Sequence, residues 1–137
     1  MAELANDSSA VLERSLYAVA EAGEDITPVF FKRFFALHPD QEQIFFQPDQ
    51  TCGVMVNEIL DSLLALDSNE GWVSISIQNL VAAHRCYGDF PLSLYQDVLD
   101  VFVATLAELA GDRWSAEFDA AWRRVTGELY ALIAKTL

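Results

Sequence analysis

A helical stripe that ends in a histidine is the feature that most constrains this chain. Between positions 77 and 91, Ile77, Leu80 and Val81 are followed by His84, so the intervals are those of successive helix turns. This spacing places the four side chains on one face of an α-helix. Because the rest of that face is apolar, we expect the imidazole of His84 to be drawn into the core and to need a partner there.

The same helical spacing recurs along the rest of the chain, and no alternating run convincingly indicates a strand. Besides the helix that carries His84, we expect long helices that begin at Ser8 or Ser9, between Asp25 and Thr27, at Thr51 or Asp49, at Pro91 and at Ser115. A short helix and a loop lie between residues 40 and 50. The prediction is one all-α domain over residues 1–137, with six long helices and a short connecting helix in crossed layers.

The charge balance excludes several classes of partner. Lys and Arg number 8 against 21 Asp and Glu, and the net charge of −13 repels nucleic acid and anionic membrane surfaces. No apolar run approaches the roughly 20 residues that span a bilayer, and the first residues lack a signal peptide pattern, so we expect a cytoplasmic protein. Cys52 and Cys86 have neither zinc-like nor redox-motif spacing and are expected to be reduced thiols.

Three roles remain open to His84 at this point: a ligand of a metal or of haem iron, a general base, or a core histidine bonded to a backbone carbonyl. No nucleophile motif or glycine-rich phosphate loop accompanies it, and a metal site made of protein ligands alone would need more than the remaining His38. Iron in a porphyrin brings its own four nitrogens and asks for one imidazole and a flat apolar slot. Nine Phe residues could furnish such a slot.

An ordered set of residues resembles the single-domain haemoglobins of bacteria and the globin domain of flavohaemoglobins. The set comprises residues 26–40 (ITPVFFKRFFALHPD), Ile44-Phe45, Leu80 to His84, Tyr87-Gly88, Tyr95 with Val98, and Trp122. The resemblance extends from about Val11 to Ile133. It implies a globin fold around a haem pocket, with haem b as the cofactor.

On the proximal side, the resemblance makes His84 the ligand of the haem iron, with its other ring nitrogen donating to the carbonyl of Leu80. Tyr95 lies near the position of a tyrosine that, with a glutamate, strengthens electron donation by the histidine in flavohaemoglobins. The glutamate has no counterpart in this sequence, and Thr126 stands where the family has a further tyrosine. The other residues assigned to the pocket on this side are Phe90 and Val98.

On the distal side, Phe31 matches the position that points at the sixth iron site and that flavohaemoglobins fill with a tyrosine. The polar distal position falls at Thr51, or at Gln50 if the helix shifts by one residue. The resemblance assigns three further residues to the porphyrin face: Phe45, Met55 and Ile59.

The expected function is reversible binding of a diatomic gas, namely oxygen, carbon monoxide or nitric oxide. Few hydrogen-bond donors are expected near the iron, so oxygen should leave quickly and the iron should autoxidise readily. The alternatives are a haem-based gas or redox sensor or interaction module, and a nitric oxide dioxygenase or peroxidase that works with a separate reductase. The absent distal tyrosine and proximal glutamate argue against the enzyme. The chain is expected to be a monomer, or a homodimer through the helices at 91–110 and 115–133.

Overall fold

The chain folds into helices throughout the part that the structure describes. This computed structural model describes the backbone of residues 2–44 and 48–137 and the side chains of residues 8–44 and 52–137. Over those ranges the elements are α1 (Ala2–Ala20), α2 (Ile26–Leu37), η1 (Pro39–Ile44), α3 (Pro48–Asp67), α4 (Val73–His84), α5 (Leu92–Ala110), η2 (Gly111–Arg113) and α6 (Ala116–Thr136), where η marks a short 3-10 helix. The predicted all-α fold with six long helices is confirmed, and η2 is an addition to it. None of the described helices is both long and apolar enough to cross a membrane.

Local capping accounts for several of the helix ends. The carboxylate of Asp25 accepts a hydrogen bond from the Thr27 amide at the start of α2, as the hydroxyl of Ser115 does from the Phe118 amide at the start of α6. Each bond satisfies an amide that has no partner within the first helical turn. Gly111 follows α5 with a φ of 59°, a left-handed conformation that glycine adopts without strain. These ends follow from residues close in sequence.

Two predicted helix starts are wrong. The first helix begins at Ala2, so Ser8 and Ser9 lie inside it, and their hydroxyls donate to the Asp67 carboxylate at the end of α3 over 2.5 and 3.0 Å. The two serines therefore make a tertiary contact instead of a helix cap. The third helix begins at Pro48, before both Asp49 and Thr51. Proline is tolerated at a first helical position because the amide there has no helical partner.

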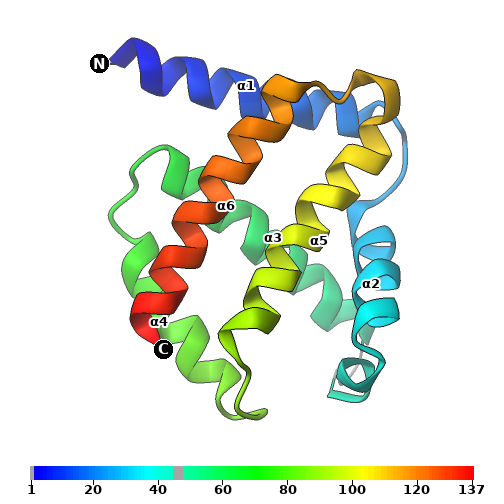
Figure 1. Cartoon of the computed structure of the whole chain (residues 1–137), viewed down its shortest axis with the longest axis vertical. Coiled ribbons are helices and arrows are strands. Elements are labelled where there is room, and N and C mark those ends of the chain that lie inside the picture. Colours follow the sequence, from blue (N-terminus) through cyan, green and yellow to red (C-terminus); the bar gives the residue numbers. More distant parts are fainter. Residues whose placement is uncertain (1, 45–47) are drawn as a thin grey trace.

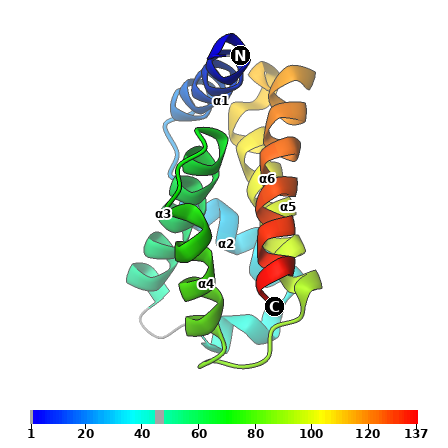
Figure 2. The same ribbon diagram turned by 90° about the vertical axis from the view of Figure 1, so that its left-hand side faces the viewer.

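The helices pack in crossed layers. Figure 1 shows α5 and α6 running together in front of α3, with α1 across one end of the pair. Seen from the side, α3 and α4 form one layer and α5 and α6 the other (Figure 2). The main packing partners of α4 are α6 and α3.

The densest part of the core joins α1, α2, α5 and α6. Trp122, Phe30 and Phe102 are fully buried there, and the rings of Phe102 and Trp122 meet edge to face with centroids 6.0 Å apart. The indole N–H of Trp122 donates to the Ser15 hydroxyl over 2.7 Å, and this hydroxyl donates to the Leu12 carbonyl over 2.6 Å. Every polar atom in this chain of bonds is satisfied, which is what burial requires.

Candidate functional site

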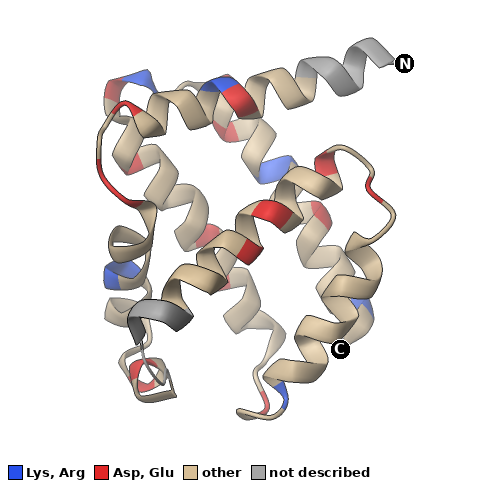
Figure 3. Ribbon diagram, turned by 180° about the vertical axis from the view of Figure 1, so that it is seen from behind, with Lys and Arg blue, Asp and Glu red and all other residues tan. Residues whose placement is uncertain are grey.

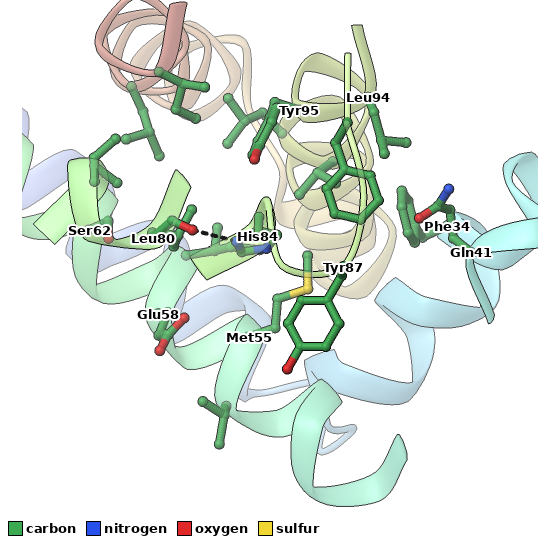
Figure 4. Close-up of a pocket in the computed structure, with 18 of the residues that line it drawn as sticks. Phe34, Gln41, Met55, Glu58, Ser62, Leu80, His84, Tyr87, Leu94 and Tyr95 are labelled. Carbon is green, nitrogen blue, oxygen red and sulfur yellow. Dashed lines mark hydrogen bonds between the residues drawn. The ribbon is translucent and has the colours of Figure 1, made fainter. Parts of the chain in front are cut away.

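A cavity of about 550 Å³ is lined by residues of both layers, and none of its described lining residues belongs to α1. Its walls come from η1 with the end of α2, from α3 and α4, and from α5 with the last turns of α6 (Figure 4). The lining residues are mostly apolar: Phe34, Gln41, Ile44, Val54, Met55, Glu58, Ile59, Ser62, Ile77, Leu80, His84, Tyr87, Phe90, Leu94, Tyr95, Val98, Leu99, Leu129 and Ile133.

His84 is the last residue of α4 and presents its ring to this cavity. Its Nδ1 lies 2.7 Å from the carbonyl oxygen of Leu80, one helical turn earlier. A carbonyl can only accept, so Nδ1 carries a proton, and in the neutral form of the ring the lone pair lies on Nε2. Within the described part of the chain, Nε2 has no hydrogen-bond partner. The predicted bond to Leu80 is present, and it leaves Nε2 able to act as a ligand.

Two aromatic rings hold the imidazole from the α5 side. The Phe90 ring meets the His84 ring edge to face, with centroids 6.1 Å apart, and the Tyr95 ring lies at 6.0 Å. Phe90 belongs to the connection between α4 and α5, which turns at Gly88 with a φ of 145°. A side chain at position 88 would be strained in that conformation. The turn therefore helps to place Phe90 against the imidazole.

Tyr95 has a perturbed hydroxyl. Burial raises its pKa above the ordinary value of 10.0, and the nearby positive charge of Arg85 opposes the shift without cancelling it. The phenol therefore stays neutral at physiological pH. Among the described residues its hydroxyl has no hydrogen-bond partner, so the group is available as a donor next to His84.

The opposite wall of the cavity is one face of α3. Met55, Ile59 and Ser62 follow each other at intervals of four and three residues and line the cavity together (Figure 4). Met55 is half-buried and Ser62 is buried, whereas Glu58 is exposed at the rim. Glu58, Asp61 and Asp67 lie along α3, which contains no Lys or Arg (Figure 3). The sequence prediction missed Ser62, although the interval from Ile59 could have identified it.

The predicted site residues divide into three groups. Seven of them line the cavity: Met55, Ile59, Leu80, His84, Phe90, Tyr95 and Val98. Phe45 lies outside the described residues, as do the side chains of Gln50 and Thr51.

Phe31 forms the third group, because it is not among the described residues that line the cavity, and its place beside the iron stays a prediction. It is 5% exposed and packs within α2, with its ring centroid 4.8 Å from that of Phe30 and 5.2 Å from that of Phe35. The side chain of α2 that lines the cavity is Phe34, one turn further along. Both rings belong to the apolar surface of one helix, so the spacing could not separate them.

Several lining residues come from parts of the chain that the sequence analysis did not assign to the site. Gln41 and Ile44 come from η1, and Leu129 and Ile133 from α6. Leu129 and Ile133 are four residues apart, which places them on one face of α6. Local spacing could not tell which part of the core they face.

The chemistry of the cavity centres on one imidazole. In the described ranges no three His, Cys, Asp or Glu side chains gather in a group that could hold a metal ion. The second histidine, His38, lies at the end of α2, where its Nε2 is 2.9 Å from the Asp97 carboxylate. The cavity thus offers one nitrogen ligand and a broad apolar surface.

No family model matches the chain, but its sequence is similar to those of curated proteins. It is 30% identical over 137 residues to a flavohemoprotein of Halalkalibacterium halodurans, an alignment that covers 97% of this chain and 32% of that protein. It is 26% identical over 127 residues to a flavohemoprotein of Rhizobium meliloti, covering 90% of this chain and 31% of that protein. The chain spans about a third of the length of these curated relatives. It therefore has an all-α globin fold and resembles, as its sequence predicted, the globin domain of flavohaemoglobins.

Proposed function

We propose that this chain binds haem in the cavity beside His84 and uses it to bind a diatomic gas reversibly. One observation carries the proposal. The Nδ1 atom of His84 is held by the Leu80 carbonyl at 2.7 Å, and the ring faces a cavity of about 550 Å³. In metal-ligating histidines the ring nitrogen that does not bind the metal usually donates a hydrogen bond of this kind.

The residues of the cavity fit a haem group. Cofactor sites are concave, mostly apolar and about 300–1,000 Å³ in volume, with a few polar groups that set the orientation of the ligand. This cavity meets each condition, since its lining is mainly Phe, Leu, Ile and Val and His84 presents a ring nitrogen. The two relatives are named for a haem group, which agrees with this fit.

Residues from both walls would hold the group. Met55 and Ile59 would contact one face from α3, and His84 the other face, backed by Phe90 and Tyr95. Val98, Leu99, Leu129 and Ile133 would close the interior end and exclude water. Haem b, when bound, supplies an iron that can take a diatomic gas as an axial ligand. We further propose that Phe45 contacts the porphyrin face and that Thr51 or Gln50 is the polar residue on the distal side.

The acceptor of His84 favours gas binding over oxygen activation. A carboxylate partner raises the basicity of an imidazole ligand more than a neutral carbonyl does. In the described part of the chain the hydrogen-bond acceptor of Nδ1 is the Leu80 carbonyl, and no carboxylate bonds to the ring. His84 would therefore donate electron density moderately.

Polar groups that could stabilise a bound gas are sparse. Among the described lining residues, the amide of Gln41 already donates to Asp40 over 3.2 Å, and the Tyr87 ring is 67% exposed at the cavity mouth. Ser62 offers one hydroxyl. Because hydrogen bonds to oxygen slow its release, we expect fast oxygen dissociation. A slow rate, typical of a pocket with a distal tyrosine, would contradict this part of the proposal.

Electron supply is a further part of the proposal. The name of the relatives joins a flavin to a haem, and the chain corresponds to about a third of their length. We therefore propose a flavin-containing reductase, fused or separate, as the electron donor. Rapid consumption of nitric oxide in the presence of such a reductase would favour the dioxygenase alternative over a gas carrier.

The test is a visible spectrum of the purified protein with one equivalent of haem, in ferric, ferrous and carbon monoxide forms. Wild type should take up haem stoichiometrically, and His84→Gly should lose stable uptake or recover it with added imidazole. His38→Gln is the matched control, because it removes the other histidine and should leave the spectrum unchanged. An unchanged spectrum in His84→Gly would refute the proposed ligand.

A further inference from the structure

We propose that Met55 is an internal ligand that holds the axial position opposite His84 when no gas is bound. This inference rests on the proposed function, because it requires haem in the cavity. It adds a second protein ligand that the cavity itself presents. Gas binding would then be a competition with the thioether of Met55.

The placement of Met55 is the first argument. It projects from α3 into the cavity, and its sulfur points toward the side on which α4 presents His84 (Figure 4). The side chain is half-buried. It shares its helix face with Ile59 and Ser62, so the backbone of α3 directs it inward.

The other donor groups of the lining are less suitable. Glu58 is exposed, and its carboxylate would have to be desolvated to enter an apolar cavity, which costs free energy. Tyr95 belongs to α5 and packs beside His84, so it lies on the same side as that ligand. Ser62 offers a neutral hydroxyl, and Tyr87 is 67% exposed at the mouth.

The chemistry of a thioether is the second argument. Methionine pairs with histidine as an axial haem ligand in cytochromes c, where it raises the reduction potential. Its side chain is unbranched and flexible, so it can reach or leave an iron without moving the helix. It is also uncharged, which suits a lining dominated by apolar residues.

A definite kinetic consequence follows. For carbon monoxide to bind, the coordinate bond from the Met55 sulfur to iron must break before the bond from iron to carbon forms, and no electron is gained or lost. The association rate of wild type should therefore level off at high carbon monoxide concentration, at the rate of thioether release.

The experiment compares haem-loaded wild type with Met55→Leu, a change that nearly conserves side-chain volume. Wild type should show a low-spin, six-coordinate ferrous spectrum without gas, and the variant a high-spin, five-coordinate one with a lower reduction potential. Its carbon monoxide association should become linear in concentration. It should be about tenfold faster than wild type at low concentration, as expected if roughly a tenth of wild-type molecules are open, and the difference should grow as the wild-type rate levels off. Leu64→Ile, on the same helix but outside the cavity lining, should behave as wild type.

A second measurement identifies the ligand without substituting Met55. The chain has two methionines, Met1 and Met55, so selenomethionine labelling marks few sites. Iron-edge X-ray absorption of labelled, haem-loaded, gas-free protein should show selenium bound to iron, which also excludes sulfur from Cys52 or Cys86. Repeating it on Met55→Leu should remove that signal.

The outcomes separate the two proposals. A five-coordinate wild type, a Met55→Leu protein identical to wild type, or iron without a selenium neighbour would overturn the role of Met55 and leave haem binding through His84 intact. Failure of wild type to take up haem would overturn both.

Discussion

The two ends of the molecule differ in whether their polar side chains have hydrogen-bond partners. At the end formed by α1 and α6, the carboxylate of Asp67 accepts from Ser8, Ser9 and Arg124, and its side chain is 2% exposed. At the cavity end, Nε2 of His84 and the hydroxyl of Tyr95 have no hydrogen-bond partner within the described ranges. The first end is a closed core, and the second is lined by groups that remain free for a ligand.

This difference indicates a division between stability and function. Closed hydrogen bonds and dense packing contribute free energy of unfolding, whereas unused donors and open space contribute binding capacity. Substitutions at the α1–α6 end should therefore destabilise the fold, and substitutions at the cavity end should alter ligand binding with little effect on the fold.

Trp122→Ala should have the largest effect on stability. It removes a fully buried ring, its edge contact with Phe102 and the bond to Ser15, and should lower the free energy of unfolding by about 3–5 kcal/mol. Urea unfolding followed by circular dichroism measures this loss. Trp72→Ala, at a position 47% exposed, is the control and should change stability by about 0.5 kcal/mol or less. Equal losses in the two variants would remove the basis for the comparison.

Asp67→Asn should rank second. The neutral amide keeps the shape of the side chain but loses the charge that faces Arg124 and two serine hydroxyls, at an expected cost of about 1–3 kcal/mol. Glu128→Gln removes the exposed carboxylate partner of the same arginine and should cost about 0.5 kcal/mol or less. If both variants proved equally mild, the Asp67 cluster would not be a source of stability.

His84→Ala should change the stability of the haem-free chain by about 1 kcal/mol or less. The half-buried imidazole makes one hydrogen bond, and it borders open space on its cavity side. The same urea titration measures this, and the His38→Gln protein serves as the reference. A loss near that of Trp122→Ala would show that His84 is primarily a core residue.

Tyr95→Phe should have the smallest effect, and only at alkaline pH. Burial raises the pKa of Tyr95 above 10.0, so at higher pH the folded chain retains a proton that the unfolded chain has lost. The free energy of unfolding therefore falls as the pH rises above about 10. The variant should lose part of this dependence in unfolding titrations between neutral and alkaline pH. Tyr17→Phe, at an exposed ring, is the control, and an identical pH dependence in Tyr95→Phe and wild type would contradict the prediction.

Features that depend on neighbouring residues were predictable from the sequence. The caps at Asp25 and Ser115 and the bond from His84 to Leu80 each join residues at most four positions apart. The family resemblance assigned seven residues that line the cavity, and helical periodicity supported those on helices because it reports which side of a helix is apolar. Spacing alone could not tell which α2 side chain lines the cavity, since the choice between Phe31 and Phe34 depends on how α2 meets its neighbours.

By itself, the sequence determined an all-α chain with one histidine at the end of an apolar stripe and too few other ligands for a metal site made of protein alone. The tertiary structure decided which distant residues meet, as Trp122 and Ser15 do across 107 positions of sequence and as Ser8 and Asp67 do across 59. It also decided that Met55 and His84 share one cavity. The physical reason is that hydrogen bonding and side-chain spacing within a helix act over about four residues, whereas the contacts between helices depend on their crossing angles and on the packing of the whole chain.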